Sequence, residues 1–597
     1  MSLKVQKAKN IIEGVTYVDD GINFIFISDK NISCKKPCIL YLYKENLELL
    51  EKIRLFDVGG LPLVKGAFIS GKGIEKISAF EVRSGAESII DRTSRRIYGR
   101  CEFGKRKKSL RSKNELSCLL KDDDFDWEND KILGLADEKT VSYKIHIRGF
   151  TKALNIDEAG TFSGVKNKIP YLKDLGINQI EMMPVYEFDE IEESFDKTKG
   201  GNKKNRINYW GYKKAYYYAV KNAFAFDKEN PEREFKELVK ECHKNGIEVI
   251  LEFYFVDVSS AFITDVIRYW LFNYHIDGIH ISSTDYNFLV GEPFLFGRKL
   301  YVDYYDGKKT DVSPLSYNDG FLVSARRFIR GDEYAIDSLL AHFMIDSGKK
   351  INYLSTHNGF SLLDCFSYDV KHNEKNGFNN FDGTDYNFSF NSGVEGKTKL
   401  KRIIKLRHKH VKNALFLLML SRGIPLIMAG DESLRTQSGN NNAFCQDNSI
   451  SWFDWNNENK DRVEIREFFK KLLSFRKNNS ILACDLSGVE NTGNMNVPLI
   501  SLHSDMAFSF VGGNSRAFGL LYNAALSRLE NKNDLIYIAV NMSAGNKRLA
   551  IPRLEKAEMK IHLSTDENVR LENDFIILPE FSCALIVDEK GIENKKI

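Results

Sequence analysis

The chain has 597 residues, of which 43% are hydrophobic and 28% are charged, and its net charge is +4. This length suits about three domains with at least one large core. The balanced charge gives no reason to expect a nucleic-acid partner, and no apolar run approaches the roughly 18 residues of a membrane span.

Residues 1–137 show the pattern of a small β domain. The runs GVTYVDDGINFIFIS (14–28) and PCILYLYKE (37–45) alternate apolar and polar residues and are interrupted by Gly, Asp, Asn and Pro. Such short strands separated by turn residues are typical of a β-sandwich. We therefore expect an N-terminal β-sandwich over residues 1–137.

Residues 138–483 alternate between strand and helix patterns. VSYKIHI (141–147) and NQIEMMPV (178–185) favour strands, and GVKNKIPYLKDLG (164–176) favours a helix. A second helix is predicted over EFKELVKECHKNG (234–246), which ends at Gly246. Its apolar face comprises Phe235, Leu238, Val239 and Cys242. This alternation predicts an α/β fold, most simply a closed (β/α)₈ TIM barrel. Residues 484–597 return to β patterns, and we expect a C-terminal β-sandwich there.

Two buried runs in the middle of the chain resemble inner strands of the barrel. The first (Ile276, Ile279, Ile281) ends at Ser282, and the second (288–290) ends at Gly291-Glu292. Functional residues of such barrels lie where the strands end. Parallel neighbours need a crossover of about a dozen residues or more, and only about five separate these runs. Either a barrel helix is missing between Ser282 and Glu292, or the second strand lies elsewhere.

Several longer motifs resemble glycoside hydrolase family 13, the α-amylase superfamily, in its glycogen-debranching, isoamylase and pullulanase branch. They are DDDFDWEND (122–130), YKIHIRGFT (143–151), NYWGY (208–212) and the segments 351–396 and 428–455. The resemblance implies a starch-binding-type module before the barrel and a β-sandwich after it. It also implies hydrolysis of α-glucans with retention, which requires two carboxyl groups about 5–5.5 Å apart.

Three positions of the expected catalytic site depart from the family pattern. The nucleophile strand, GFRFD in the family, here reads GIHIS, so that Ser282 stands at the nucleophile position and His280 at the arginine position. Asn358 stands at the position of the third carboxylate. Serine and asparagine cannot supply the negative charge of the residues that they replace. We therefore expect the hydrolysis of α-1,6 branches to be impaired or lost.

Other positions match the family. Glu292 in GEP matches the acid/base position, and Tyr212 and His357 match residues of the sugar platform. Trp210 and Tyr212 are candidates for stacking on sugar rings, and core packing is the alternative reading. The amides of GNNNAFCQDN (439–448) are slightly favoured as sugar contacts over a purely structural turn.

The leading hypothesis is an α-glucan-binding protein that binds glycogen, maltooligosaccharide or branched dextrin with little or no hydrolysis. Association with a glycogen enzyme or with a second copy of the chain is compatible with it. One alternative is an active hydrolase that uses Glu292 with a relocated carboxylate such as Asp285 or Asp257. Another is an interaction protein without a sugar ligand.

The remaining expectations concern the compartment and cofactors. The N-terminus lacks the apolar stretch of a secretory signal, and nine cysteines show neither a disulfide framework nor zinc-ligand spacing. We expect reduced cysteines, a cytoplasmic protein, and no metal or other cofactor.

Overall fold

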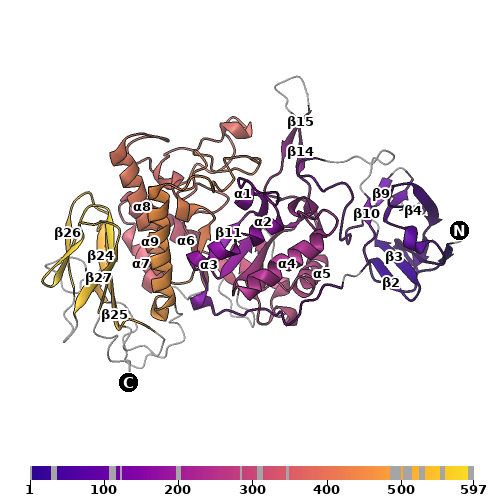
Figure 1. Ribbon diagram of the computed structural model, residues 1–597, viewed down its shortest axis with the longest axis horizontal. Coiled ribbons are helices and arrows are strands. Elements are labelled where there is room, and N and C mark those ends of the chain that lie inside the picture. The colour runs from indigo at the N-terminus through magenta and orange to yellow at the C-terminus, as the bar shows by residue number, and fades with distance from the viewer. Residues whose placement is uncertain are drawn as a thin grey trace.

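The computed structural model has a β domain at each end of the chain and a helix-covered barrel between them (Figure 1). The described residues are 3–27, 37–85, 87–89, 91–105, 116–121, 124–195, 203–282, 286–305, 314–344, 349–483, 499–501, 514–523, 531–551 and 558–588. Within them, no helix combines the length and the apolar character that crossing a bilayer demands.

Two antiparallel sheets form the N-terminal domain. One contains β1 (Lys4–Gln6), β2 (Gly14–Val18), β3 (Gly21–Ile27), β6 (Phe56–Val58) and β7 (Leu61–Ser70). The other contains β4 (Cys38–Tyr43), β5 (Leu49–Arg54), β8 (Ala79–Ser84), β9 (Glu87–Ile89) and β10 (Ser117–Cys118). Phe24 on β3 and Phe80 on β8 join the two sheets, with their ring centroids 5.4 Å apart and edge to face.

Eight parallel strands close the central barrel, as the sequence predicts. They are β11 (Ser142–Ile145), β12 (Gln179–Met182), β17 (Glu248–Tyr254), β18 (Gly278–Ser282), β19 (Lys299–Val302), β20 (Leu315–Tyr317), β21 (Lys350–Tyr353) and β22 (Ile424–Met428). Closure is completed where Ser142 of β11 pairs with Leu426 of β22. Between β12 and the next helix, the antiparallel pairs β13 (Tyr186–Phe188) with β16 (Ala215–Val220) and β14 (Ile191–Phe195) with β15 (Lys203–Ile207) extend from the barrel.

The α-helices surround the barrel. They are α1 (Ile147–Thr151), α2 (Phe162–Lys166), α3 (Ile169–Leu175), α4 (Pro231–Lys244), α5 (Ser260–Asn273), α6 (Asp319–Arg330), α7 (Ile336–Met344), α8 (Lys401–Leu420) and α9 (Lys460–Lys477). Helix α4 confirms the predicted pattern. It begins with Pro231, where the missing N–H costs nothing, and Gly246 beyond its end takes a φ of 70°. Its four predicted apolar residues are fully buried.

The connection between β18 and β19 differs from the prediction. Residues Phe288–Val290 do not form a strand; Asn287–Leu289 is a 3₁₀ turn, and Pro293–Leu295 is another. The fifth strand is Lys299–Val302, which pairs with β18. The crossover is therefore long enough for parallel neighbours, and residues 286–298 replace the expected barrel helix with two short turns.

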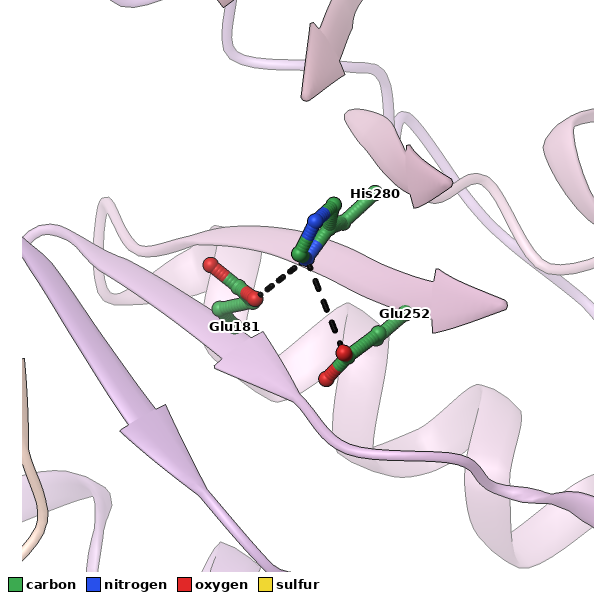
Figure 2. Close-up of side chains that lie close together, drawn as sticks. All are labelled: Glu181, Glu252 and His280. Atoms are coloured by element: carbon green, nitrogen blue, oxygen red, sulfur yellow. Dashed lines mark hydrogen bonds and ion pairs between the residues drawn. The ribbon is translucent and has the colours of Figure 1, made fainter. Parts of the chain in front are cut away.

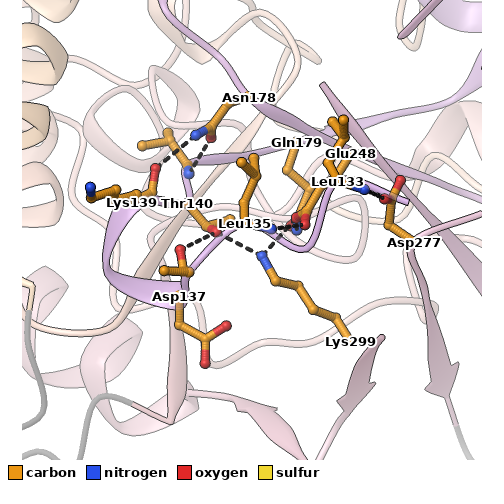
Figure 3. Close-up of polar contacts among 12 residues, drawn as sticks. Leu133, Leu135, Asp137, Lys139, Thr140, Asn178, Gln179, Glu248, Asp277 and Lys299 are labelled. Atoms are coloured by element: carbon orange, nitrogen blue, oxygen red, sulfur yellow. Dashed lines mark hydrogen bonds and ion pairs between the residues drawn. The ribbon is translucent and has the colours of Figure 1, made fainter. Parts of the chain in front are cut away.

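A segment at the N-terminal end of the barrel, residues 133–140, is held against the strands by buried polar side chains (Figure 3). The Leu133 amide donates to Asp277 Oδ1 at 2.8 Å, and the Leu135 amide donates to Glu248 Oε1 at 2.7 Å. Lys299 Nζ donates at 2.7 Å to both Thr140 Oγ1 and Glu248 Oε2. We call residues 133–140 the strap; it adds hydrogen bonds to charged groups at this end of the barrel, where Glu248 also accepts from Gln179 and Asp277 also accepts from the Val249 amide.

The C-terminal domain contains two antiparallel sheets. Their strands are β23 (Leu499–Ser501), β24 (Ala517–Asn523), β25 (Leu535–Asn541), β27 (Met559–Ser564) and β30 (Ser582–Asp588), with β26 (Lys547–Ala550), β28 (Arg570–Glu572) and β29 (Phe575–Leu578) in the second sheet. Phe518 of β24 contacts Phe328 of α6, with ring centroids 5.6 Å apart. The apolar side of the first sheet therefore packs on the barrel helices.

Candidate functional site

Four charged or titratable side chains from the first four barrel strands meet inside the barrel. Lys144 Nζ lies 2.8 Å from Glu181 Oε1 and 2.8 Å from Glu252 Oε2. Glu181 Oε1 also lies 2.9 Å from His280 Nδ1, and Figure 2 shows His280 between the two glutamates. None of the four is more than 2% exposed. We call Lys144, Glu181, Glu252 and His280 the barrel cluster.

The pKa values of Lys144, Glu181 and His280 favour their charged forms. Burial disfavours charge on Lys144, but the two glutamates outweigh it and raise the pKa of its ammonium. Burial would raise the pKa of Glu181, but Lys144 and His280 hold it well below its usual range. For His280, burial is outweighed by Glu181 and by the hydrogen bond to Asp303, so that its pKa is raised to about 9. The imidazole is therefore protonated at neutral pH.

Ligand atoms of Glu181, Glu252 and His280 all lie within 4.8 Å of one another, a spacing that could hold a metal ion. However, the ammonium group of Lys144 already contacts an oxygen of each glutamate. The chain's own cation therefore balances these carboxylates, and protonated His280 could not act as a metal ligand. The geometry favours an internal ion-pair cluster.

Asp303 connects the barrel cluster to the C-terminal face of the barrel. It directly follows β19, and its side chain is 54% exposed. His280 Nε2 lies 3.1 Å from Asp303 Oδ1, and the Ser282 hydroxyl donates to Asp303 Oδ2 at 3.0 Å. Sequence reasoning missed Asp303 because the fifth strand was placed too early; the run KLYV (299–302) was the signal that could have found it. Ser282 therefore stands beside a carboxylate that follows the fifth strand.

Glu292 lies elsewhere in the connection between β18 and β19. It precedes the 3₁₀ turn Pro293–Leu295, and its side chain is partly exposed. The expectation that it ends a barrel strand is wrong. The apolar run before it is too short to distinguish a strand from a turn, and Gly291 with a φ of 92° breaks the extended backbone. A catalytic role for Glu292 stays a prediction.

The predicted aromatic platform forms one cluster. The Tyr212 ring stacks on the His357 ring with centroids 5.0 Å apart, and the Trp210 ring meets His357 edge to face at 4.8 Å. Burial, with a further effect from Lys144, holds the pKa of His357 well below its usual value, so its ring is neutral. Trp210 is 8% exposed, whereas Asn358 is exposed. The structure thus brings Tyr212, Trp210 and His357 together, with Trp210 mainly in the core.

The amides of residues 439–448 bond within the protein. Asn440 Nδ2 donates to Asn376 Oδ1 at 3.0 Å, and Asn441 Nδ2 donates to Asn387 Oδ1 at 2.9 Å. Gln446 Nε2 also donates to Asn376 Oδ1, at 2.7 Å. Asn440, Asn441 and Gln446 are buried. These contacts favour the structural reading of this loop over the sugar-binding one.

Of the two aspartates considered as relocated carboxylates, the structure describes only Asp257. Asp257 lies beyond β17, is exposed and takes a φ of 53°. Asp285 lies outside the described residues. Within the described chain, the carboxylate held directly at the ends of strands four and five is that of Asp303.

Comparisons with known proteins agree with this architecture. Residues 144–266 match the family model "Alpha amylase, catalytic domain". The chain is 28% identical to chloroplastic isoamylase 1 of Arabidopsis thaliana over 584 residues, covering 78% of this chain and 74% of that protein. It is 31% identical to the glycogen operon protein GlgX homolog of Haemophilus influenzae over 443 residues, covering 60% and 66%.

Solved structures share the fold at low sequence identity. The GBS pullulanase SAP in complex with maltotetraose aligns with a TM-score of 0.71 and 14% identity, covering 97% of this chain and 88% of that one. The barrel and its flanking β domains therefore follow the pullulanase architecture. By its motifs, its family match and its relatives, the chain belongs to glycoside hydrolase family 13, in the isoamylase and glycogen-debranching branch.

Proposed function

We propose that this chain binds an α-glucan at the C-terminal face of its barrel and does not hydrolyse it. The observation that carries the proposal is the arrangement of Ser282 and Asp303. At the position where the family has its nucleophile, a hydroxyl donates a hydrogen bond to the carboxylate of the next strand. Among the described residues, the fourth strand ends in this hydroxyl rather than in an acid that could work together with Asp303.

The chemistry of retention supports the loss of hydrolysis. It requires a nucleophilic carboxylate and a second carboxyl group about 5–5.5 Å away that protonates the leaving oxygen. Glu181 and Glu252 are buried and bound to Lys144, so neither can approach a sugar without breaking an internal ion pair. Asp303 is a poor base for activating Ser282, because a carboxylate has a low proton affinity and this one already contacts His280 at 3.1 Å.

Binding is supported by groups that face the ligand side of the barrel. Tyr304, next to Asp303, is 75% exposed, and Tyr212 is partly exposed beside His357. Aromatic faces match the apolar C–H faces of sugar rings, and a fixed carboxylate accepts hydrogen bonds from sugar hydroxyls. The structural neighbour GBS pullulanase SAP was solved in complex with maltotetraose, which supports a glucan as the ligand class.

Binding is tested by calorimetry with maltoheptaose and with glycogen. We expect Tyr304→Ala and Asp303→Ala each to weaken binding at the barrel face about tenfold, because each removes one contact of about 1.4 kcal/mol. Tyr334→Ala is the matched control, since Tyr334 is 63% exposed but lies between α6 and α7. Failure of every glucan to bind would instead favour an interaction protein without a sugar ligand.

Hydrolysis is tested by the release of reducing ends from glycogen β-limit dextrin. The natural protein, Asp303→Asn and Glu292→Gln are prepared identically and are expected to show the same background. Release that disappears in Glu292→Gln would establish the alternative of an active hydrolase that uses Glu292. Release that disappears only in Asp303→Asn would assign the acid to Asp303.

A further inference from the structure

Most of the motif DDDFDWEND (122–130) lies in an irregular segment that leads from the N-terminal sandwich to the strap. We call residues 124–132 of this segment the linker. They belong to no helix or strand, so side-chain contacts rather than a backbone ladder hold them on the barrel. These contacts reach the end of α4 and the residues just before β18, at the end of the barrel opposite the proposed glucan site.

A buried histidine lies between a carboxylate of the linker and a carboxylate of the barrel. His243 Nδ1 is 2.9 Å from Oδ1 of Asp130, and His243 Nε2 is 2.9 Å from Oδ2 of Asp277. The three side chains are at most 5% exposed. An ionised carboxylate only accepts hydrogen bonds, so both ring nitrogens donate and the ring carries two protons. Burial alone would lower the pKa of His243, but Asp277 and Asp130 outweigh it and raise that pKa.

The two carboxylates are held in the protein to different degrees. Asp277 Oδ1 accepts from the Leu133 amide at 2.8 Å (Figure 3), and Asp277 Oδ2 accepts from the Val249 amide at 2.8 Å. Asp130 is contacted on its other oxygen by His275, whose Nδ1 lies 2.9 Å from Oδ2. A neutral imidazole with its proton on Nδ1 can make this last bond, so the bond does not require a charged ring. Asp277 is therefore fixed in the barrel, whereas Asp130 depends on the two histidines.

The other charged or titratable groups near His243 surround Asp277 or the first part of the linker. They are Cys242, Glu248, Arg298 and Lys299 near Asp277, and Lys240, Lys244 and Glu128 beside the linker. Lys240 Nζ donates to the Asp126 carbonyl at 2.8 Å and pairs with Glu128 at 2.6 Å. The Trp127 ring stacks on the His275 ring with centroids 3.9 Å apart. These contacts hold the first part of the linker without any proton on His243.

We propose that His243 is a pH-sensitive latch, which holds the linker on the barrel while its ring carries two protons and releases Asp130 when one proton is lost. A neutral ring has a single donor, and the Asp277 carboxylate, which two amides fix in place, retains it. Nδ1 then presents a lone pair to the Asp130 carboxylate, and two acceptors at this distance repel each other. The part of the linker around Asp130 therefore leaves the barrel, while the part around Trp127 stays.

The latch loses strength as the pH rises. The latched state binds the proton of His243 more tightly than the released state, in which the pKa is about 6.5. The latch is therefore at full strength below about pH 6.5. Above this value it weakens by about tenfold per pH unit, until the pH has passed the raised pKa of the latched state. The connection between the sandwich and the barrel is then looser at alkaline pH than at acidic pH.

Hydrogen exchange of the full chain between pH 6 and pH 9 tests the latch, after correction for the intrinsic pH dependence of exchange. The reporter is the peptide that contains the Asp130 amide, which donates to the Trp127 carbonyl at 3.0 Å. We expect its protection in the natural protein to fall about tenfold across this range. In His243→Gln the neutral amide offers one nitrogen donor at every pH, so protection should be low and independent of pH.

Asp130→Asn tests the same latch without removing the histidine. The new amide can donate to the lone pair of neutral His243 and accept from His275, so we expect protection to persist at pH 9. His372→Gln is the control for a surface histidine, since His372 lies 3.2 Å from Glu395 and is 37% exposed. The Leu135 amide, which Glu248 holds at 2.7 Å, is the internal control and should exchange alike in all variants.

Three results would refute the latch. They are the same pH profile in the natural protein and in His243→Gln, protection in Asp130→Asn that still falls with pH, and an equal change in all peptides. The last result would show that His243 acts on global stability rather than on the linker. If His243→Gln does not fold, the comparison of the natural protein with Asp130→Asn decides the question.

Discussion

The hydroxyl group of Ser282 donates a 3.0 Å hydrogen bond to the Asp303 carboxylate, which His280 contacts from the other side. A carboxylate that is fixed by two donors can accept hydrogen bonds from a ligand with little loss of conformational entropy. Replacing its neighbour by an acid should therefore disturb the site rather than repair it.

We expect Ser282→Asp to destabilise the protein without producing hydrolysis. Two carboxylates within hydrogen-bond distance repel each other, so the pKa of one of them rises above that of an isolated aspartate. Because the pKa in the folded state then exceeds that in the unfolded state, the protonated group stabilises the fold at low pH. This stabilisation is lost as the pH rises through the raised pKa. Thermal unfolding from pH 5 to pH 8 measures the effect. In Ser282→Asn the new side chain has the shape of aspartate but no charge, so the unfolding temperature should depend less on pH. The same pH dependence in both variants would contradict this account.

Removing the internal cation should be costly. Lys144→Met leaves Glu181 and Glu252 buried with their main counter-ion absent, and we expect a loss of about 3–5 kcal/mol in the free energy of unfolding. Denaturation by urea measures it. Lys166→Met is the control, because Lys166 pairs with Glu237 at 3.0 Å on the surface and its loss should cost less than about 1 kcal/mol. A similar small loss in both variants would show that the barrel cluster contributes little net stability.

The charge of His280 should make stability depend on pH. Its folded pKa of about 9 exceeds the unfolded value of about 6.5, so the folded state binds the proton more tightly. The resulting stabilisation is fully present below about pH 6.5 and is lost as the pH rises through about 9. The difference in unfolding free energy between the natural protein and His280→Gln should therefore shrink between pH 6 and pH 10.

A surface histidine provides the control for this titration. His372 lies 3.2 Å from Glu395 and is 37% exposed, so His372→Gln should leave the pH profile of stability nearly unchanged. A constant difference between the natural protein and His280→Gln across the same pH range would show that His280 does not change its charge there.

The strap gives a prediction at the opposite end of the barrel. Glu248 accepts from the Leu135 amide and from Lys299, so Glu248→Ala leaves a buried ammonium and an unpaired amide. We expect a loss of about 3–5 kcal/mol in the free energy of unfolding and faster hydrogen exchange of Leu135. Glu237→Ala, on the surface, is the control. Glucan binding by Glu248→Ala at 4 °C should be unchanged, because the proposed glucan site lies at the opposite end of the barrel. A loss of binding in the folded variant would contradict the independence of the two ends.

The sequence predicts the barrel well because its strands and helices alternate with clear periodicity. Helix α4 shows this, with its apolar face and its end at Gly246. The fifth strand could not be predicted in the same way. It has four residues and begins with a lysine, whose burial depends on Glu248, far away in the chain. The apolar run at 288–290 was the stronger local signal, although the turn residues Gly291 and Pro293 follow it closely.

The candidate site was predicted only in part for a similar reason. Ser282 and His280 could be placed because they end the fourth strand, whose apolar pattern is regular. The partnership of His280 with Glu181 and Lys144 depends on how the strands align around the closed barrel. In a linear sequence, charged residues in short strands follow the pattern of surface residues. Their pairing becomes evident only when the strands are placed around the closed barrel.

The strap has a consequence for where the chain can be divided. The expected boundary at residues 137 and 138 runs through it, and a cut there separates the Leu133 and Leu135 amides from Asp277 and Glu248. In an isolated barrel that starts at residue 138, the N-terminal end of the barrel would be open to water. The carboxylates of Asp277 and Glu248 would then lack the two amide donors of the strap. The smallest fragment that folds independently should therefore begin upstream of Asp130, which contacts both His243 and His275 at 2.9 Å.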